Sequence, residues 1–496
     1  MRKYDLLVDR MRKIADVNYS AALLSWDQET YMPSKGANTR ARQLSTLSGI
    51  SHELYTSRET EFLLSAAETE SNLKEIEIRN VELLKEEFIR QKKYPTSFVE
   101  EMSKNVSECF HAWNEARVKN QFSVFATPLE KLIELKVKET ELLGYETHPY
   151  DALLDLYERK LTVNQLDVLF FEMKQKLSPL LNRIFTSTQV DDTFFYQQYD
   201  KTRQWDFGVD LLKQMGYDFN CGRQDISTHP FTINFSSNDV RVTTRIDENN
   251  LSDMIWSCIH EGGHALYEQG LPENEYGMPL SEAVSLGIHE SQSRLWENNV
   301  GRSFSYWKNN FKILQNYFPD QLNSITAEQF YKACNKVEPS FIRTNADELT
   351  YHFHIMIRYE IEKKLISREI KTKDLPVIWN EMYKDYLGIE VRNDKEGVLQ
   401  DVHWSHGSFG YFPTYSIGSF YAAQFFSKAK GVISDLNGQI EKSDFRNLLN
   451  WLRNSIHKHG KYYSAQDLCL NITGETLNVN YFMKYVSEKY EKIYNL

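Results

Sequence analysis

The sequence predicts a mainly α-helical protein with one small β element, and three observations carry this prediction. Only 12 prolines and 21 glycines occur in 496 residues, so few positions interrupt a helix. Long segments place apolar residues three or four positions apart between Glu and Lys, which is the pattern of amphipathic helices. Residues 226–247 instead alternate β-branched and polar residues, which is typical of strands.

The expected elements follow one another without a low-complexity linker or an internal repeat, so we expect residues 1–496 to form a single domain. Helical periodicity predicts long helices over residues 37–55, 72–92, 97–119 and 129–143. The stretch HPFTINFSSNDVRVTTRI predicts two short strands joined by the polar turn SSND. A helix then begins at Ser252, its expected N-cap, and stops at Gly270 and Pro272, before a further helix over 281–299.

Composition excludes several classes of function. The formal charge of -11 argues against nucleic acid or an anionic membrane as partner, because Lys and Arg drive binding to phosphate. The N-terminal MRKYDLLVDRMRKIADVNYS lacks the unbroken apolar core of a secretory signal, and we expect no membrane span because no apolar run reaches 18 residues. Five scattered cysteines without a CxxC pair are typical of reduced thiols, so we expect a cytoplasmic protein.

The stretch IHEGGHALYEQG, residues 259–270, contains two histidines four positions apart. On a helix His260 and His264 project within about 40° of each other, so both imidazoles can bind one zinc ion. Glu261, beside the first ligand, suits a general base that takes a proton from water, and this is the HExxH arrangement. Composition alone predicts about 0.03 such matches in the chain. The competing interpretation, histidines on an ordinary helix, is disfavoured because apolar neighbours predict burial, and buried histidines need partners.

A catalytic zinc ion usually has three protein ligands and one open position. The downstream candidates for the third ligand are Glu268, Glu273, Glu275, Glu282 and Glu290. Residues eight apart lie within about 80° on a helix, so periodicity does not choose between Glu282 and Glu290, and His289 is expected to support the site or to pack. Gly262 and Gly263 each cost a helix about 1 kcal/mol, which predicts close approach of another backbone or of substrate.

The string HEGGH, followed by HESQSR, resembles the carboxypeptidase Taq family of zinc metallocarboxypeptidases. Further strings similar to that family occur in the same order, and the likeness spans nearly the whole chain. They are LSWDQETYMP at 24–33, HPF at 229–231, DVRVT at 239–243, IRTNAD at 342–347 and GVLQDVHW at 397–404. The resemblance implies a mostly helical, elongated, two-lobed metallopeptidase with a deep central groove, which assembles as a homodimer.

The resemblance also implies an activity and a ligand set. It implies an enzyme that releases single C-terminal amino acids from peptides with broad specificity, using one Zn²⁺ per chain, with Co²⁺ or Mn²⁺ as alternative ions. The partners are then peptides with a free C-terminus. Matched to this sequence, the family's metal ligands are His260, His264 and Glu290, and the general base is Glu261. The resemblance therefore selects Glu290 over Glu282.

The other motifs supply candidates for substrate binding. A C-terminal carboxylate suits the fork of an arginine, and we expect this role for Arg343 first and Arg241 second, each with a structural ion pair as the alternative. Gln400 and Asp401 are expected to bind substrate or to support the site. His229 either contacts substrate or braces the strands, since an edge strand can pair with an extended peptide.

The oxyanion of a tetrahedral intermediate needs a hydrogen-bond donor besides the metal. The segment QDVHWSHGSFGYFPTYS offers His403, His406, Tyr411 and Tyr415. By analogy with related helical zinc peptidases, we favour His403 and Tyr415. Asp347 is expected to orient Arg343 or a metal ligand.

Two rival functions stay open on the sequence. A zinc oligopeptidase or endopeptidase also uses HExxH on a helical scaffold, and an amidated C-terminus would discriminate it. A noncatalytic binding protein with a structural metal is disfavoured, because structural zinc sites are generally closed by four ligands and only three are evident.

Overall fold

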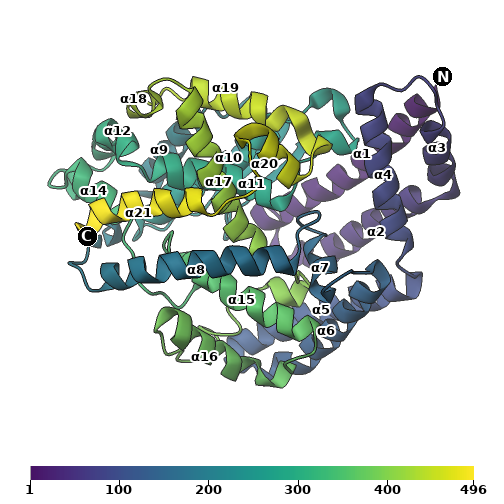
Figure 1. The fold of residues 1–496 in the computed structure, drawn as a ribbon, viewed down its shortest axis with the longest axis horizontal. Helices are drawn as coiled ribbons and strands as arrows, with labels where there is room; N and C mark the ends of the chain where they lie inside the picture. Colours follow the sequence, from purple (N-terminus) through teal and green to yellow (C-terminus); the bar gives the residue numbers. More distant parts are fainter. Residues whose placement is uncertain (1) are drawn as a thin grey trace. The chain divides into compact units, whose positions relative to one another are not determined.

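The computed structural model describes residues 2–496, which fold mostly into helices (Figure 1). Contacts divide them into two compact units. Unit 1 contains the described residues up to Lys92, Asp191–Cys334 and Tyr421–Leu477. Unit 2 contains Lys93–Val190, Asn335–Phe420 and Asn478–Leu496. Each unit is thus assembled from three separate segments of the chain.

Unit 1 contains a three-stranded sheet and most of the helices. Its first helices are α1 (Lys3–Thr30), α2 (Ala37–Thr56), α3 (Arg58–Glu68), α4 (Glu75–Lys92) and α9 (Lys201–Met215). Its strands are β1 (Gln224–Ile226), β2 (Thr232–Ser236) and β3 (Asp239–Thr244). They are followed by α10 (Leu251–Glu268), α11 (Leu286–Arg294), the π-helical segment η5 (Leu295–Gly301), α12 (Phe304–Tyr317), α13 (Pro319–Leu322) and α14 (Ala327–Cys334). The last helices are α18 (Leu436–Glu441), α19 (Arg446–Ser455) and α20 (Ala465–Thr473).

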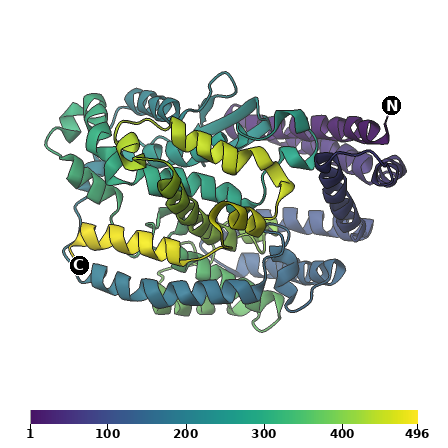
Figure 2. The same cartoon turned by 45° about the horizontal axis from the view of Figure 1, so that its top comes forward.

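Unit 2 is helical, and α17 (Pro413–Val432) begins in it and continues into unit 1. Its other helices are α5 (Thr96–Lys119), α6 (Ser123–Leu143), α7 (Pro149–Leu154), α8 (Val163–Phe185), α15 (Tyr351–Ile366), α16 (Leu375–Leu387) and α21 (Asn480–Tyr494). The 3-10 helices η6 (Arg343–Asn345) and η8 (His403–His406) carry two of the sequence motifs. Figure 1 and Figure 2 both show α21, in yellow, running alongside α8, so the last segment of the chain packs against a much earlier one.

The sheet lies next to the site helix in sequence and in space. Its strand order is β1-β3-β2, with β2 antiparallel to β3 and β1 parallel to it. The predicted hairpin is confirmed by β2 and β3, whereas β1 was missed because a three-residue parallel strand has no turn signal beside it. Strands β2 and β3 both pack against α10.

Helix α10 is largely buried. Met254, Ile255 and Leu266 are fully buried, and each such side chain stabilises the fold by about 1.5–3 kcal/mol relative to exposure. The helix begins one residue after Asn250, whose side chain accepts a hydrogen bond from the backbone N–H of Ser252 at 3.1 Å. The prediction of Ser252 as the N-cap was therefore wrong by two residues, because Asn and Ser are equally good caps.

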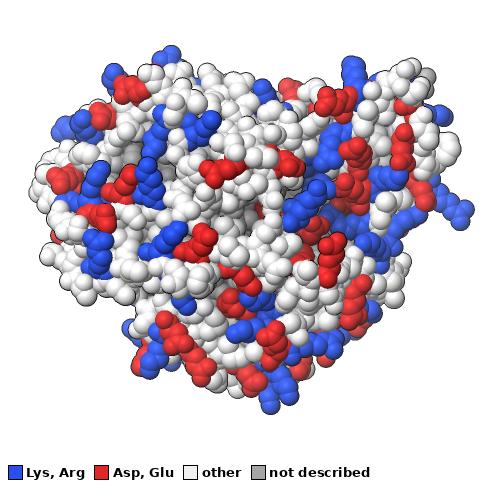
Figure 3. Space-filling view, viewed as in Figure 1, with Lys and Arg blue, Asp and Glu red and all other residues white. Residues whose placement is uncertain are grey.

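The four long N-terminal helices are confirmed as α2, α4, α5 and α6, with ends shifted by up to six residues. The helix predicted over 281–299 begins only at Leu286, where Ser285 is the N-cap, and turns π-helical at Leu295. No helix within residues 2–496 is long and apolar enough to cross a membrane. On the face shown in Figure 3, Lys and Arg are interspersed with Asp and Glu, as expected where amphipathic helices turn their charged sides to water.

Candidate metal centre and arginine network

Helix α10 turns both histidines of the HExxH string to one side. The imidazole centroids of His260 and His264 lie 4.9 Å apart. Glu290, on α11, places its Oε2 atom 3.4 Å from His264 Nε2 and 3.7 Å from His260 Nε2. The three ligand atoms lie within 4.8 Å of one another, so a single cation fits among them. Glu282, the rival candidate, is exposed and pairs with Lys461 at 3.0 Å.

The electrostatic environment keeps Glu290 and His264 in forms that bind a cation. Burial by itself would raise the pKa of Glu290, but the charges of Arg294 and His260 hold it well below its usual range. Arg294 Nε donates to Glu290 Oε1 at 2.7 Å, which leaves Oε2 directed at the histidines. Burial, together with the charge of His289, lowers the pKa of His264 to about 3, so its imidazole is neutral at pH 7 and keeps a lone pair.

Gly262 and Gly263 allow α9 and α11 to approach α10 closely. A Cβ atom on Gly263 would lie 2.7 Å from Ser293 Cα and 2.8 Å from the carbonyl oxygen of Gln292, which are backbone atoms of α11. A Cβ on Gly262 would lie 2.8 Å from the Leu212 side chain on α9. Of the two interpretations of the glycines, close packing is confirmed and room for substrate is wrong. Contact through Gly263 brings Glu290 within reach of His264.

Glu261 lies beside the histidines and is anchored by the sheet. The hydroxyl of Thr232, on β2, lies 2.7 Å from Glu261 Oε2, to which it donates, and 3.0 Å from the Glu261 carbonyl oxygen. Only 7% of Glu261 is exposed, and this burial raises the pKa of its carboxyl group. A carboxylate with a raised pKa accepts a proton more readily near neutral pH, which suits a general base.

Polar groups on the far side of each imidazole form an outer layer. His260 Nδ1 lies 2.9 Å from Glu297 Oε2, and this carboxylate also accepts from Arg294 and Arg302. His264 Nδ1 lies 2.6 Å from His289 Nδ1. His289 supports the site, as expected from the sequence, whereas Glu297 was not predicted. A usable signal existed, because Glu297 follows Glu290 by seven residues, or two helical turns.

The strand residues contact one another rather than the histidine pair. Arg241 forms two hydrogen bonds of 2.9 Å with Asp239, and its guanidinium lies 4.5 Å from the centroid of the Trp26 ring. The pair with Asp239 is the structural ion pair weighed against substrate binding. The contact with Trp26 joins the DVRVT and LSWDQETYMP motifs. His229 is exposed, and its carbonyl oxygen accepts from Ser227 at 2.6 Å.

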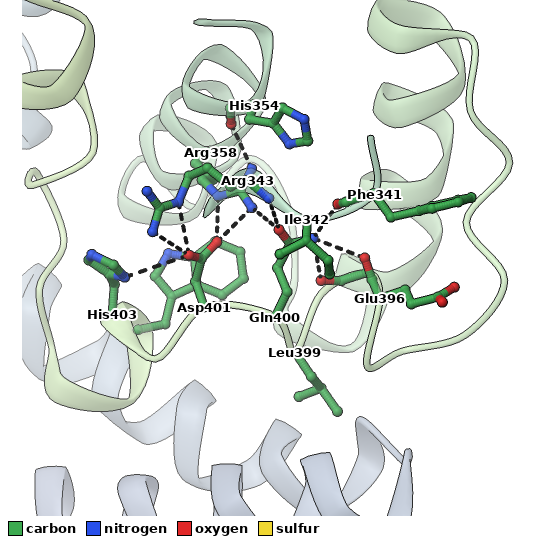
Figure 4. Close-up of polar contacts among 12 residues, drawn as sticks. Phe341, Ile342, Arg343, His354, Arg358, Glu396, Leu399, Gln400, Asp401 and His403 are labelled. Carbon is green, nitrogen blue, oxygen red and sulfur yellow. Dashed lines mark hydrogen bonds and ion pairs between the residues drawn. The ribbon is translucent and has the colours of Figure 1, made fainter. Parts of the chain in front are cut away.

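In unit 2, a buried network surrounds Asp401 (Figure 4). Its Oδ1 atom accepts from Arg343 Nε and Nη2 at 2.9 and 2.8 Å, and its Oδ2 atom accepts from Arg358 Nε at 2.7 Å. Arg358 is fully buried and Arg343 is 6% exposed. Burial alone would raise the pKa of Asp401, but the two guanidinium charges hold it well below its usual range. Arg358 was not foreseen from the sequence.

Gln400 fixes the same network from the other side. Its Oε1 atom accepts from the Arg343 backbone N–H at 2.9 Å and from Arg358 Nη2 at 2.8 Å. Gln400 Nε2 donates to backbone carbonyls, including that of Phe341 at 3.1 Å. Asp347, expected to orient Arg343 or a metal ligand, instead accepts hydrogen bonds from the backbone N–H groups of Leu349 at 2.8 Å and Thr350 at 2.9 Å, just before α15. That expectation was wrong, because an Asp side chain readily accepts from backbone N–H groups two and three residues further along the chain.

His403 and Tyr415 lie together at the edge of this network. His403 Nε2 is 3.2 Å from the Tyr415 hydroxyl, and His403 Nδ1 is 3.9 Å from Asp401 Oδ1. Burial, and then the charge of Arg343, lower the pKa of His403 to about 3, so the imidazole is neutral at pH 7. The Arg343 guanidinium lies 4.9 Å from the centroid of the Tyr415 ring. Arg343, Gln400, Asp401, His403 and Tyr415 therefore meet in unit 2, whereas Asp347 does not join them.

Comparisons with known proteins give the family. The family model for Carboxypeptidase Taq (M32) metallopeptidase matches residues 6–490. Carboxypeptidase 1 of Bacillus subtilis (strain 168) is 41% identical over 490 residues, which cover 98% of each chain. The solved structure described as The Structure of CHT is 54% identical, with a TM-score of 0.97 over 98% of this chain and 99% of that one. The M32 carboxypeptidase from Deinococcus radiodurans R1 is 36% identical, with a TM-score of 0.98 over the whole of both chains. The chain therefore belongs to the carboxypeptidase Taq (M32) metallopeptidase family and is a metal-dependent carboxypeptidase.

Proposed function

We propose that the enzyme releases single C-terminal amino acids from peptides with broad specificity, with one Zn²⁺ held by His260, His264 and Glu290. The observation that carries the proposal is the partly buried cluster of three ligand atoms within 4.8 Å of one another. Two imidazoles and one carboxylate are a ligand set of catalytic zinc sites that keep one position open. A bound Zn²⁺ would polarise the scissile carbonyl and make water more acidic, and Co²⁺ or Mn²⁺ are alternative ions.

Glu261 is the proposed general base. It takes a proton from the water whose oxygen attacks the carbonyl carbon, and it delivers that proton to the nitrogen of the leaving amino acid as the C–N bond breaks. Two observations support this role: the hydrogen bond from Thr232 keeps the carboxylate in one orientation, and burial raises its pKa.

The network of unit 2 carries the proposed contacts with substrate. Arg343 binds the C-terminal carboxylate, and Tyr415 with His403 stabilises the oxyanion. Two arginines share the one carboxylate of Asp401, so the network has a positive charge that an anion can balance. Gln400 and Asp401 hold Arg343 in place. Substrate contacts by Arg241 and His229 stay predictions.

A paired substrate experiment tests the function. The zinc-loaded enzyme is incubated with one peptide in free-acid and amidated forms, and the products are followed by mass spectrometry. Stepwise loss of C-terminal residues from the free acid alone supports a carboxypeptidase. Internal cleavage of both forms would instead support the endopeptidase alternative, and no cleavage of either would support a noncatalytic protein.

Residues 1–496 are further proposed to act as one catalytic domain and to assemble as a cytoplasmic homodimer. The family model supports the first part, because it matches across both units. Sedimentation equilibrium of the zinc-loaded protein tests the dimer, since a monomer mass at micromolar concentration would contradict it. Fractionation of cells that express the chain tests the location.

A further inference from the structure

Glu297 contacts a proposed metal ligand from outside the cluster. It lies on η5, the π-helical segment that continues α11. Its Oε2 atom is 2.9 Å from His260 Nδ1, on the edge of the imidazole opposite the ligand atoms. Only 6% of Glu297 is exposed. Glu297 lies outside the HExxH string. It lies instead on a π-helical segment, and such segments are frequent at functional sites.

Two arginines fix the orientation of this carboxylate. Arg294 Nη1 donates to Glu297 Oε2 at 3.1 Å, and Arg302 Nη2 donates to Oε1 at 3.0 Å. Arg302 is itself held, because its guanidinium lies 3.8 Å from the centroid of the Trp256 ring on α10. With both oxygens engaged, Glu297 cannot turn away from His260 without breaking a buried ion pair.

The contact determines which nitrogen of His260 carries the proton. An ionised carboxylate only accepts hydrogen bonds, so Nδ1 must be the donor. The lone pair of the neutral imidazole then lies on Nε2, which faces Glu290 Oε2 at 3.7 Å. A carboxylate on the outer nitrogen thus fixes both the tautomer and the angle of a histidine ligand, and raises its basicity.

The other histidine has a different outer contact, which serves as an internal comparison. His264 Nδ1 meets His289 Nδ1 at 2.6 Å, and His289 Nε2 meets Glu268 Oε1 at 2.7 Å. The carboxylate of Glu268 therefore acts through an intervening imidazole. His260 alone of the pair has a carboxylate in direct contact with Nδ1 among the contacts of residues 2–496.

We propose that Glu297, fixed by Arg294 and Arg302, is a positioning residue that holds His260 in the tautomer and orientation that bind the metal. The proposal rests on the proposed metal centre. It extends the site from three ligands to a charged outer layer carried by the π-helical segment, and it requires metal affinity to depend on a residue that does not touch the metal.

The test measures Zn²⁺ affinity directly, by competition between the metal-free full-length protein and a chromophoric chelator. Glu297→Ala should weaken binding by about 10- to 100-fold, the usual effect of removing such a partner. Glu297→Gln should weaken it less, because the amide oxygen still accepts from Nδ1. The control is Glu77→Ala, which removes a buried carboxylate of the same unit that pairs with Arg2 and contacts no histidine. It should bind Zn²⁺ like the wild type.

Two further readouts separate a positioning role from damage to the fold. Thermal unfolding of the metal-free variants shows whether they fold, and the visible absorption of the Co²⁺-loaded proteins reports ligand geometry. If Glu297→Ala does not fold, Glu297→Gln decides, and its unchanged affinity and spectrum would overturn the proposal. Folded Glu297→Ala with wild-type affinity would overturn it as well. A wild-type protein that binds no divalent metal would contradict the proposed function and this inference together.

Discussion

The polar network around the histidine pair and the one around Asp401 bury opposite excesses of charge. Around the histidine pair of unit 1, the carboxylates of Glu261, Glu290 and Glu297 outnumber the guanidiniums of Arg294 and Arg302. In unit 2, Arg343 and Arg358 share the single carboxylate of Asp401. Buried charge is expensive unless it is balanced, so each network has a place for a ligand of the missing sign. This difference is the reason for proposing a metal cation at one network and a substrate carboxylate at the other.

The largest effect on activity is expected from removing the proposed general base, Glu261, from the network of unit 1. Glu261→Gln keeps the shape of the side chain but removes the base, so kcat should fall by about 10²- to 10⁴-fold. Zn²⁺ content, measured by atomic absorption, should stay that of the wild type. Glu282→Gln, an exposed glutamate of the same unit, should leave both values unchanged. Full activity of Glu261→Gln would exclude it as the base.

The second largest effect concerns the anion-binding network. Asp401→Asn leaves two buried arginines without a counter-charge, which should lower the free energy of unfolding at pH 7 by about 3–5 kcal/mol. Urea unfolding followed by circular dichroism measures it. Asp444→Asn breaks an exposed pair with Arg446 and should change stability little. Equal stability of Asp401→Asn and the wild type would mean that Asp401 balances no charge.

Low pH should remove the contribution of the Asp401 charge to the free energy of unfolding of the wild type. The pKa of Asp401 is depressed in the folded protein, so its stabilisation is fully present above the unfolded pKa of about 3.9 and is lost as the pH falls below that value. The difference in unfolding free energy between wild type and Asp401→Asn should therefore shrink below about pH 4 and be constant from pH 5 to 7. A difference that grew on acidification would contradict the depressed pKa.

A smaller effect is expected from Arg343→Ala. Loss of a charged hydrogen-bond partner costs about 1.5–3 kcal/mol, so kcat/KM for free-acid peptides should fall by roughly 10- to 100-fold. The exposed Arg392, which lies over the Phe341 ring, supplies the control, because Arg392→Ala should act like the wild type. Any residual cleavage of amidated peptides should be unaffected. An equal loss on both substrate forms would contradict carboxylate recognition by Arg343.

The smallest effect distinguishes packing from charge. Gly263→Ala places a methyl group against the backbone of α11, which should cost about 1–3 kcal/mol of stability and weaken Zn²⁺ binding. Gly49→Ala, at an exposed helix position with open space around it, should instead stabilise the protein by up to about 1 kcal/mol. Thermal unfolding compares them. A more stable Gly263→Ala would show that α11 can move away at no cost.

The parts of the site that the sequence predicts depend on local patterns, whereas the parts that it does not predict depend on contacts between residues far apart in the sequence. The HExxH helix and the hairpin were evident because apolar periodicity and β-branched alternation are local signals. Choosing Glu290 required the family resemblance, since helical spacing treats it and Glu282 alike. The meeting of Asp401 with Arg358 depends on how the segment before η8 lies against α15, which no local pattern encodes. The π-helical turn at Leu295 likewise leaves the apolar pattern of the sequence unchanged.

The backbone contact at Gly263 also limits how the metal centre can adapt to different ions. Main-chain atoms of α11 already lie against α10 at Gly263, so the two helices cannot come closer together. The helices cannot move closer together around a smaller ion, so that adjustment must come from rotation of the Glu290 side chain. Discrimination between ions then depends on the rotamer of the Glu290 side chain, because both histidines are fixed on one helix.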